Sequence, residues 1–307
     1  MTQALSKNST VVLNSIRIAA FRFGIGIAGT FAPAAIIKRA ARWFSTPSVQ
    51  ARQRAGGVES DARRGVMCID GERLAIYEWG DPRTQPYVLL SHGWSSFALR
   101  FQPWIAPLRA AGFAIVAFDQ VGHGQSSGAR ATLPQFAHHL TCVAAHYGPT
   151  AALIGHSMGG AAAAIAMTDG LRAERAVLLA PAADLRAALR RFTRGIGLPR
   201  CLSTRLRELI ETQAQVRFDS LLMHPRVRRL AQPALIVHDL DDREVPWEEG
   251  ERYARYWPGA RLLSTGGLGH HRVAADADVI DAALMFLRGG EVGARVVSTQ
   301  ELPYGYA

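Results

Sequence analysis

The stretch Ala151-Ala-Leu-Ile-Gly-His-Ser157-Met-Gly-Gly160 decides the fold, and an alanine-rich segment follows it directly. This pattern indicates a short apolar strand, a Gly-x-Ser-x-Gly turn and a helix, with no residues between them. So sharp a turn forces Ser157 into a strained conformation, and the flanking glycines leave room for it. The sequence therefore predicts that the Ser157 hydroxyl stands at the top of a sheet and that the Met158 amide points at whatever this hydroxyl attacks. A free serine hydroxyl is a weak nucleophile, so a base and an acid are expected elsewhere in the chain.

Two other segments match functional motifs only in their letters. Gly124-Gln-Ser126-Ser-Gly128 repeats the Gly-x-Ser-x-Gly pattern, but no helix follows it, so Ser126 is interpreted as a loop residue that could also line a pocket. Gly24-Ile-Gly26-Ile-Ala-Gly29 matches Gly-x-Gly-x-x-Gly. It lacks a preceding strand and the acidic residue expected about 20 positions later, so a dinucleotide cofactor is not expected.

Strand-like and helix-like segments alternate through most of the chain. A tight Asp70-Gly71 turn joins the first two of eight apolar runs, which predicts a hairpin. The later runs are separated by helical stretches, which predicts an α/β fold with a mostly parallel sheet and helices on both faces. The eight runs are residues 66–70, 73–79, 87–91, 113–118, 151–154, 176–179, 234–238 and 261–264. Thr132-Leu-Pro-Gln135 is a capping box for a helix to about Tyr147, and residues 274–288 form a final amphipathic helix.

The interval between the sixth and seventh strands is too long for a simple crossover. It contains amphipathic pieces, so residues 184–230 are predicted to form a small helical cap over the carboxyl ends of the strands. The expected organisation begins with an apolar, basic N-terminal arm (1–48) and a linker (49–65). An α/β core in two parts (66–183 and 231–290) surrounds the cap (184–230), and a loose tail (291–307) follows.

The basic charge is concentrated in two segments. The chain carries a net charge of +10, of which residues 1–65 hold +8 and residues 184–230 hold +7, leaving −5 for the remainder. This distribution favours an anionic surface such as lipid headgroups, and a solvated face is the alternative. Neither segment resembles a nucleic-acid-binding module, so no nucleic-acid partner is expected.

The arm from Val11 to Phe44 is apolar but interrupted by charges. Its longest uncharged run, Phe23–Ile37, is shorter than the roughly 20 residues that cross a bilayer. Two interpretations stay open for residues 11–44: a peripheral contact with a membrane, and a helical arm packed on its own domain. The expected location is the cytoplasm, with association with the inner membrane surface left open.

The cysteines and histidines give no sign of a metal or a disulfide framework. Cys68, Cys142 and Cys201 are far apart, which favours a reducing compartment. The His pairs 138/139 and 270/271 lack the spacing of metal ligands, so no metal is expected.

Candidates for the acid and the base follow Ser157 in the order that a strand-to-helix elbow requires. The seventh strand ends in an acidic cluster, Asp239-Leu-Asp241-Asp242, and the eighth leads into a glycine-rich loop with His270 and His271. In this arrangement a histidine takes the serine proton and returns it to the leaving group, while a carboxylate fixes the histidine tautomer.

The chain resembles serine hydrolases of the α/β-hydrolase superfamily, in the branch of capped esterases and monoacylglycerol-lipase-like enzymes. The resemblance covers residues 66–288 and rests on four pieces, Leu90-Ser-His92-Gly93-Trp94, Asp119-x-x-Gly122-His-Gly124-x-Ser126, Gly155-His-Ser157-Met-Gly159-Gly160, and His238…Asp242…Val245-Pro246 with Gly269-His270. It implies an α/β-hydrolase fold with a helical cap. One departure exists, since Asp239 stands where the family usually has glycine.

The resemblance also assigns site residues. Asp242, three residues before Val245-Pro246, matches the family acid, while Asp241 remains the main rival and Asp239 lies close to the strand. Asp184, after the preceding strand, is a further alternative. His270 follows Gly269 as the family base does, and His271 is expected to point elsewhere and pack. The backbone amides of Trp94 and Met158 are implied as the oxyanion hole.

The leading functional hypothesis is a serine hydrolase that cleaves carboxylic esters, a lipid-like ester being one option. An acyltransferase or thioesterase with the same three residues is an alternative, and a peptidase is not excluded. A non-catalytic binding protein on a hydrolase fold is an alternative of another class.

Overall fold

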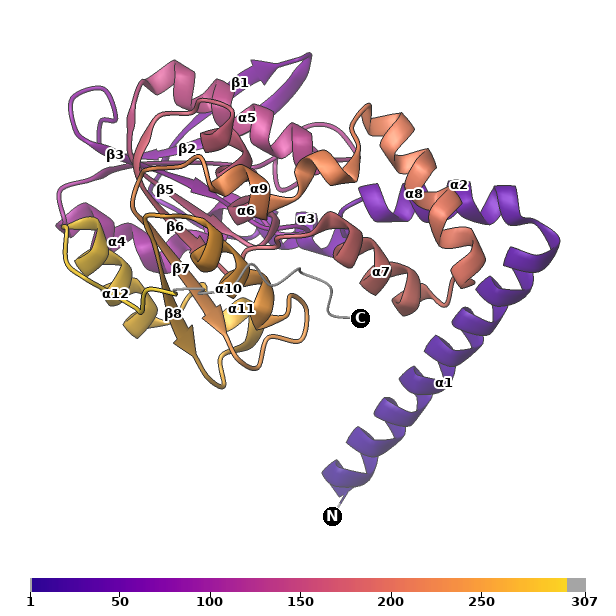
Figure 1. The fold of residues 1–307 in the computed structure, drawn as a ribbon. Helices are drawn as coiled ribbons and strands as arrows, with labels where there is room; N and C mark the ends of the chain where they lie inside the picture. The colour runs from indigo at the N-terminus through magenta and orange to yellow at the C-terminus, as the bar shows by residue number, and fades with distance from the viewer. Residues whose placement is uncertain (1, 297–307) are drawn as a thin grey trace. The chain divides into compact units, whose positions relative to one another are not determined.

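The computed structural model describes the backbone of residues 2–296 and the side chains of residues 17–296. The chain divides into two compact units. The first consists of the chain up to Ser45 together with Leu185–Ser220, and the second of Thr46–Asp184 together with the chain from Leu221 onward. Figure 1 gives the labels of their helices and strands.

The second unit is built on one eight-stranded sheet in the order β1-β2-β4-β3-β5-β6-β7-β8. The pairs β1–β2 and β2–β4 are antiparallel and all the others are parallel, so the predicted mostly parallel sheet is confirmed. The strands are β1 (Arg63–Ile69), β2 (Glu72–Trp79), β3 (Tyr87–Ser91), β4 (Ala114–Phe118), β5 (Thr150–His156), β6 (Ala173–Leu179), β7 (Ala234–Asp239) and β8 (Ala260–Thr265). The central strands β3 and β4 are buried throughout, as continuous apolar runs predict for a sheet covered on both faces.

Helices cover both faces of this sheet. One layer contains α5 (Leu133–Tyr147), α6 (Met158–Thr168), α9 (Met223–Val227) and α10 (Trp247–Tyr256), and the other contains α4 (Gln102–Ala110) and α12 (Ala277–Leu287). The second unit also contains the 3₁₀-helix η1 (Ala98–Phe101) and the short helix α11 (Gly269–Arg272). The 3₁₀-helix η2 (Phe218–Leu221) spans the point in the sequence at which the first unit ends. The Thr132 hydroxyl accepts from the Gln135 amide at 3.4 Å, so the predicted cap begins α5.

The segment predicted as a linker, residues 49–65, is instead part of the second unit. It holds α3 (Val49–Gly56), which buries Ala51 and Ala55. The Arg52 guanidinium donates to the backbone carbonyls of Gly124 (3.4 Å), Ser126 (2.5 Å) and Gly128 (2.8 Å). The linker prediction is wrong because a polar composition does not reveal that one arginine anchors a distant loop.

The first unit combines the N-terminal arm with the insertion. Its helices are α1 (Thr2–Phe31), α2 (Pro33–Ser45), α7 (Leu185–Ile196) and α8 (Arg200–Ala214). Ile36 and Ile37 of α2 are buried in one apolar cluster with Leu202 and Leu206 of α8. Burial of such side chains stabilises by about 1.5–3 kcal/mol each, so the arm and the insertion depend on one another for their core.

The segment predicted as a loose tail is anchored where it begins. Val292 is buried, and Ala294 and Leu262 exchange two backbone hydrogen bonds of 2.8 Å. Its last part, residues 297–307, lies outside the described residues. Within the described part of the chain, no helix has the length and apolar character to cross a membrane.

Candidate active site

Ser157 stands on a strained elbow between β5 and α6. Its backbone has φ 55° and ψ −120°, a left-handed conformation that side chains rarely adopt. Its amide donates to the Leu179 carbonyl of β6 at 2.8 Å, and its carbonyl accepts from the Ala161 amide at 3.1 Å. These bonds fix the turn, so the hydroxyl projects from the carboxyl end of the sheet as the sequence predicts.

Two glycines make this elbow possible. A Cβ atom on Gly159 would lie 2.3 Å from the Ser91 carbonyl oxygen, and one on Gly155 would lie 2.6 Å from the Gly159 carbonyl oxygen. Contacts this short do not occur in folded proteins, so no larger residue fits at either position without moving the backbone. The small residues let α6 approach β3 and β5 closely enough to aim the serine.

His270 lies against the serine hydroxyl. Its Nε2 atom is 3.0 Å from the Ser157 Oγ atom, and the residue is 7% exposed. His156, the residue before Ser157, donates from Nε2 to the His270 backbone carbonyl at 2.8 Å. His156 therefore helps to hold the main chain that carries His270, a contact that no sequence motif signals.

Asp242 is the carboxylate next to His270. Its Oδ2 atom is 2.7 Å from His270 Nδ1, and its Oδ1 atom accepts from the Glu244 and Val245 amides at 2.8 and 2.9 Å. Burial raises the pKa of Asp242, but hydrogen bonds from His238 and His270 and the nearby His270 charge outweigh burial and hold this pKa well below its usual range. With its proton on Nδ1, His270 donates to this carboxylate and can accept the Ser157 proton at Nε2.

The two rival carboxylates are engaged elsewhere. The Asp241 side chain accepts from the Gly267 amide at 2.8 Å and lies on the exposed side of the turn. Asp239 is buried and accepts from the Thr265 hydroxyl at 2.6 Å and from the amides of Gly269, Asp241 and Leu268 at 2.9–3.1 Å. Asp239, which replaces the glycine usual in the family, thus ties the loop before His270 to the end of β7.

The two amides predicted as an oxyanion hole belong to the first residue of α6 and to the loop after β3. Met158 is the first residue of α6, so its N–H has no acceptor within the helix. Trp94 follows β3 and lines the same pocket as Ser157, and its amide has no hydrogen-bond acceptor among the described residues. The Trp94 ring packs against the His123 ring at a centroid distance of 5.1 Å.

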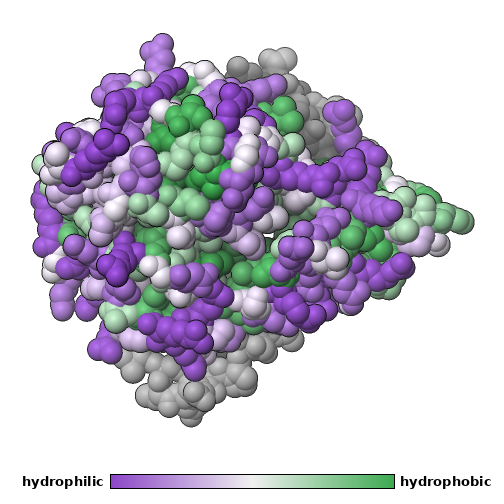
Figure 2. Space-filling view, turned by 90° about the horizontal axis from the view of Figure 1, so that it is seen from above, coloured by the Kyte–Doolittle hydropathy of each residue, from purple (hydrophilic) through white to green (hydrophobic). Residues whose placement is uncertain are grey.

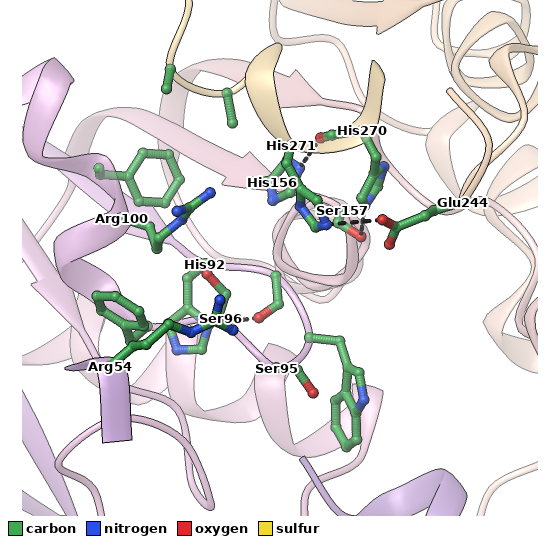
Figure 3. Close-up of a pocket in the computed structure, with 16 residues that line it drawn as sticks. Arg54, His92, Ser95, Ser96, Arg100, His156, Ser157, Glu244, His270 and His271 are labelled. Carbon is green, nitrogen blue, oxygen red and sulfur yellow. Dashed lines mark hydrogen bonds and ion pairs between the residues drawn. The ribbon is translucent and has the colours of Figure 1, made fainter. Parts of the chain in front are cut away.

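A pocket of about 400 Å³ opens onto Ser157 (Figure 3). Its apolar wall is formed by Trp94, Phe97, Phe101, Ala274 and Ala275, and its polar wall includes Arg54, Arg100, Glu244 and His271. Ser126 is absent from the described lining and donates to the Asp119 carbonyl at 2.5 Å, which agrees with its interpretation as a loop residue.

His271 was expected to point away from the site and pack, but it lines the pocket. It is exposed at the pocket, and its Nε2 atom lies 2.9 Å from a Glu244 carboxylate oxygen. The Glu244 hydrogen bond is the main cause that raises the pKa of His271, and the same bond is the main cause that lowers the pKa of Glu244. The prediction was wrong because the carboxylate that attracts His271 comes from a distant turn.

A metal centre finds no support in the described residues, where no group of three or more His, Cys, Asp or Glu side chains could hold an ion. Cys68, Cys142 and Cys201 are all free thiols.

Four buried histidines should make the protein sensitive to mild acid. Burial lowers the pKa of His92 and His139 to about 4 and of His123 and His156 to about 3. The unfolded chain binds these protons near pH 6.5 and the folded chain does not, so stability is lost as pH falls from about 6.5 towards 4. We expect the free energy of unfolding in urea to fall by up to about 1.4 kcal/mol per pH unit for each such histidine.

One buried histidine and one exposed arginine supply a matched pair of variants. The His139→Gln variant should show a shallower pH dependence between pH 6.5 and 4.5, whereas Arg83→Gln, an exposed change that removes no group titrating in this range, should keep the wild-type slope. Equal slopes in wild type and His139→Gln would contradict the assignment of a neutral buried His139.

The eight-stranded sheet and the β5–Ser157–α6 elbow define an α/β hydrolase of the serine-hydrolase type. The family model described as serine aminopeptidase, S33, matches residues 82–247, and the chain belongs to this family.

Individual relatives share only part of their sequence with this chain. The bifunctional esterase/perhydrolase DCH of Acinetobacter calcoaceticus is 24% identical over 278 residues, which cover 73% of this chain and 99% of that protein. A monoacylglycerol lipase of Mycolicibacterium smegmatis is 34% identical over 102 residues, 30% of this chain and 36% of the relative. A crystal structure of a membrane phospholipase A superposes with a TM-score of 0.57 at 20% identity and covers 92% of this chain and 98% of its own. The family is therefore one of esterase-like and lipase-like α/β hydrolases.

Proposed function

We propose that the protein hydrolyses carboxylic esters through an acyl-enzyme on Ser157. The observation that carries this proposal is the continuous hydrogen-bonded chain from the Ser157 hydroxyl through His270 to Asp242, with distances of 3.0 and 2.7 Å, at the floor of an open pocket. Esterase and lipase activities named for the relatives support the same reaction class.

The first half of the reaction forms a covalent intermediate. His270 Nε2 accepts the hydroxyl proton while Ser157 Oγ attacks the ester carbonyl carbon. The amides of Trp94 and Met158 donate to the negative oxygen of the tetrahedral intermediate, which is the main electrostatic contribution expected of such a site. The intermediate collapses, the alcohol leaves with the proton from His270, and the acyl group remains on Ser157.

The second half repeats these steps with water. His270 takes a proton from the water that attacks the acyl-enzyme, and it returns this proton to Ser157 as the acid is released. Asp242 keeps the His270 proton on Nδ1 and stabilises the imidazolium that forms twice in each cycle. The proposed reaction requires no cofactor.

The pocket argues against an aminopeptidase, the activity in the family's description. An aminopeptidase must hold a substrate ammonium group with a carboxylate. Glu244 is the one acid among the described lining residues, and it is already paired with His271. Arg54 and Arg100 line the same pocket and would repel an ammonium group.

Active-site labelling with a fluorophosphonate tests the proposal. The reagent should label wild type and Ser126→Ala, which keeps the nucleophile, and should fail to label Ser157→Ala. A neutral ester such as p-nitrophenyl butyrate should slow the labelling of wild type in proportion to its turnover. Labelling that persists in Ser157→Ala, or a wild type that neither reacts nor turns over esters, would refute the proposal. A panel of substrates that includes thioesters and acyl acceptors separates an esterase from a thioesterase and an acyltransferase.

A further inference from the structure

Two arginines in the pocket have no acidic partner among the described residues. Arg54 comes from α3 and Arg100 from η1, and both side chains are exposed to the pocket solvent. No carboxylate of the described residues forms an ion pair with either guanidinium. Glu244, the acid in the described lining, pairs with His271 at 2.9 Å instead. In the view of Figure 3, the two arginines lie on one side of Ser157 and Glu244 lies on the other.

The pocket therefore combines an apolar wall with a surplus of positive charge beside the serine. The apolar wall suits an acyl or aryl group, and paired guanidinium donors suit a carboxylate or phosphate. We infer that the preferred substrates are esters that carry an anionic group, held by Arg54 and Arg100 while Ser157 attacks the ester carbonyl. This inference rests on the proposed function and names its substrate class.

Matched pairs of esters test the inference. Butyrate release is measured for 1-butyryl glycerol 3-phosphate against 1-butyryl glycerol, and for 3-butyryloxybenzoate against 3-butyryloxybenzamide. We expect kcat/KM to be at least about tenfold higher for one or both anionic members, since charge-assisted hydrogen bonds are the strong ones. The pair with the larger preference identifies phosphate or carboxylate as the recognised group.

Variants separate recognition from folding. Arg54→Gln and Arg100→Gln should each lower kcat/KM about tenfold for the anionic ester and less than about twofold for its neutral partner. Arg83→Gln, an exposed site of the same unit outside the described pocket lining, should change neither. Equal wild-type rates on both members of each pair, or variants that slow both members alike, would overturn the inference while ester hydrolysis itself stands. A wild type that turns over none of the esters would instead refute the proposed function.

A second, independent observation concerns the first unit. Phe23, Ile27 and Phe31 of α1 are 72%, 45% and 84% exposed, and their spacing of four residues places them on one face of the helix. The opposite face packs within the unit, because Ile25 is buried and a Cβ on Gly29 would lie 3.0 Å from Pro199. Figure 2 shows hydrophobic and strongly hydrophilic residues side by side at the right-hand tip, where α1 turns into α2 in Figure 1.

The excess of basic over acidic residues in the chain lies in this same unit. The two segments that form it contain 14 Lys and Arg against three Asp and Glu, whereas the rest of the chain contains 21 against 22. The structure thus joins in one body the two basic segments that are 140 residues apart in the sequence. An exposed apolar stripe on a unit of net charge +11 has the chemistry of a peripheral membrane anchor.

The geometry points to the Phe23–Ile27–Phe31 stripe as a docking surface for an anionic phospholipid bilayer. Apolar side chains enter the headgroup boundary, and Lys and Arg side chains of the unit meet the lipid phosphates. The charge favours a lipid surface over a second copy of this chain, because two units of net charge +11 repel one another.

Vesicle sedimentation tests the docking surface. We expect the full chain to sediment with vesicles of phosphatidylcholine containing 30% phosphatidylglycerol and to bind pure phosphatidylcholine much more weakly, with binding lost as salt rises. Phe23→Ser and Phe31→Ser should each lower the partition coefficient about tenfold. Val66→Ser and Met285→Ser, at exposed apolar positions of the second unit, should leave it unchanged.

Three results would overturn the docking surface. Wild type could fail to bind the anionic vesicles, or the four serine variants could bind equally well. Alternatively, wild type could be a dimer in solution that Phe23→Ser with Phe31→Ser converts to a monomer, which would show that a second copy occupies the stripe. Ester turnover measured without vesicles reports separately that each variant is folded.

Discussion

Replacing Ser157 by alanine should lower kcat for p-nitrophenyl butyrate by about 10⁵- to 10⁶-fold, to a rate close to the background. The variant keeps the proposed oxyanion amides and the His270–Asp242 pair but has no atom that can form the proposed acyl-enzyme. Alanine fits in place of serine without added volume, and the strained backbone at φ 55° is held by the Leu179 and Ala161 contacts. The measurement is the steady-state rate for acyl chains from acetate to decanoate, since the preferred length in wild type also reports the size of the pocket.

Ser126→Ala is the matched control for this experiment, because Ser126 stands in the same Gly-x-Ser-x-Gly pattern. It loses two hydrogen bonds, to the Asp119 carbonyl and from the Ala75 amide, so it should unfold at lower urea while its kcat changes little. A Ser157→Ala variant that retains more than about one hundredth of wild-type kcat would contradict the assignment of the nucleophile.

Replacing Asp242 by asparagine should lower kcat by about 10⁴-fold. An asparagine amide keeps the shape of the side chain but stabilises the wrong tautomer of His270 and cannot offset the charge of the imidazolium. The Glu244 and Val245 amides still hold the side-chain oxygen, so the geometry of the turn is retained. Kinetics with p-nitrophenyl butyrate together with urea unfolding separate this electrostatic loss from a loss of folded protein.

Asp241→Asn serves as the comparison, because this exposed carboxylate accepts only the Gly267 amide among the contacts described for its side chain. A surface change of this kind costs within about 0.5 kcal/mol, so kcat should stay within about twofold of wild type. A larger loss in Asp241→Asn than in Asp242→Asn would reverse the two assignments.

The sequence predicts the sheet and the site best where local pattern and position carry the information. Eight apolar runs correspond to eight strands, and the Gly155-x-Ser157-x-Gly159 turn lies between β5 and α6 as its flanking residues require. Ser157, His270 and Asp242 were each predicted from their place after a strand, and His270 lies within hydrogen-bond distance of both other residues. Their chemical roles stay predictions that the variants above test.

Contacts between distant segments were the part that the sequence did not reveal. Arg52 binds three carbonyls of a loop more than 70 residues away, and nothing in a polar stretch distinguishes this arginine from a solvated one. The pairing of His271 with Glu244 and the four hydrogen bonds of Asp239 likewise depend on loops that meet only in the folded chain. The burial of α2 against α8 joins two segments that have no local signal for one another.

That burial has a consequence for the order in which the nascent chain can fold. Ile36 and Ile37 of α2 leave the ribosome well before Leu202 and Leu206 of α8, which lie about 165 residues later. At 5–20 residues per second, synthesis of the intervening chain takes roughly 10–30 s. During this interval the apolar face of α2 has no partner helix, so α2 is made well before the helix that completes its core.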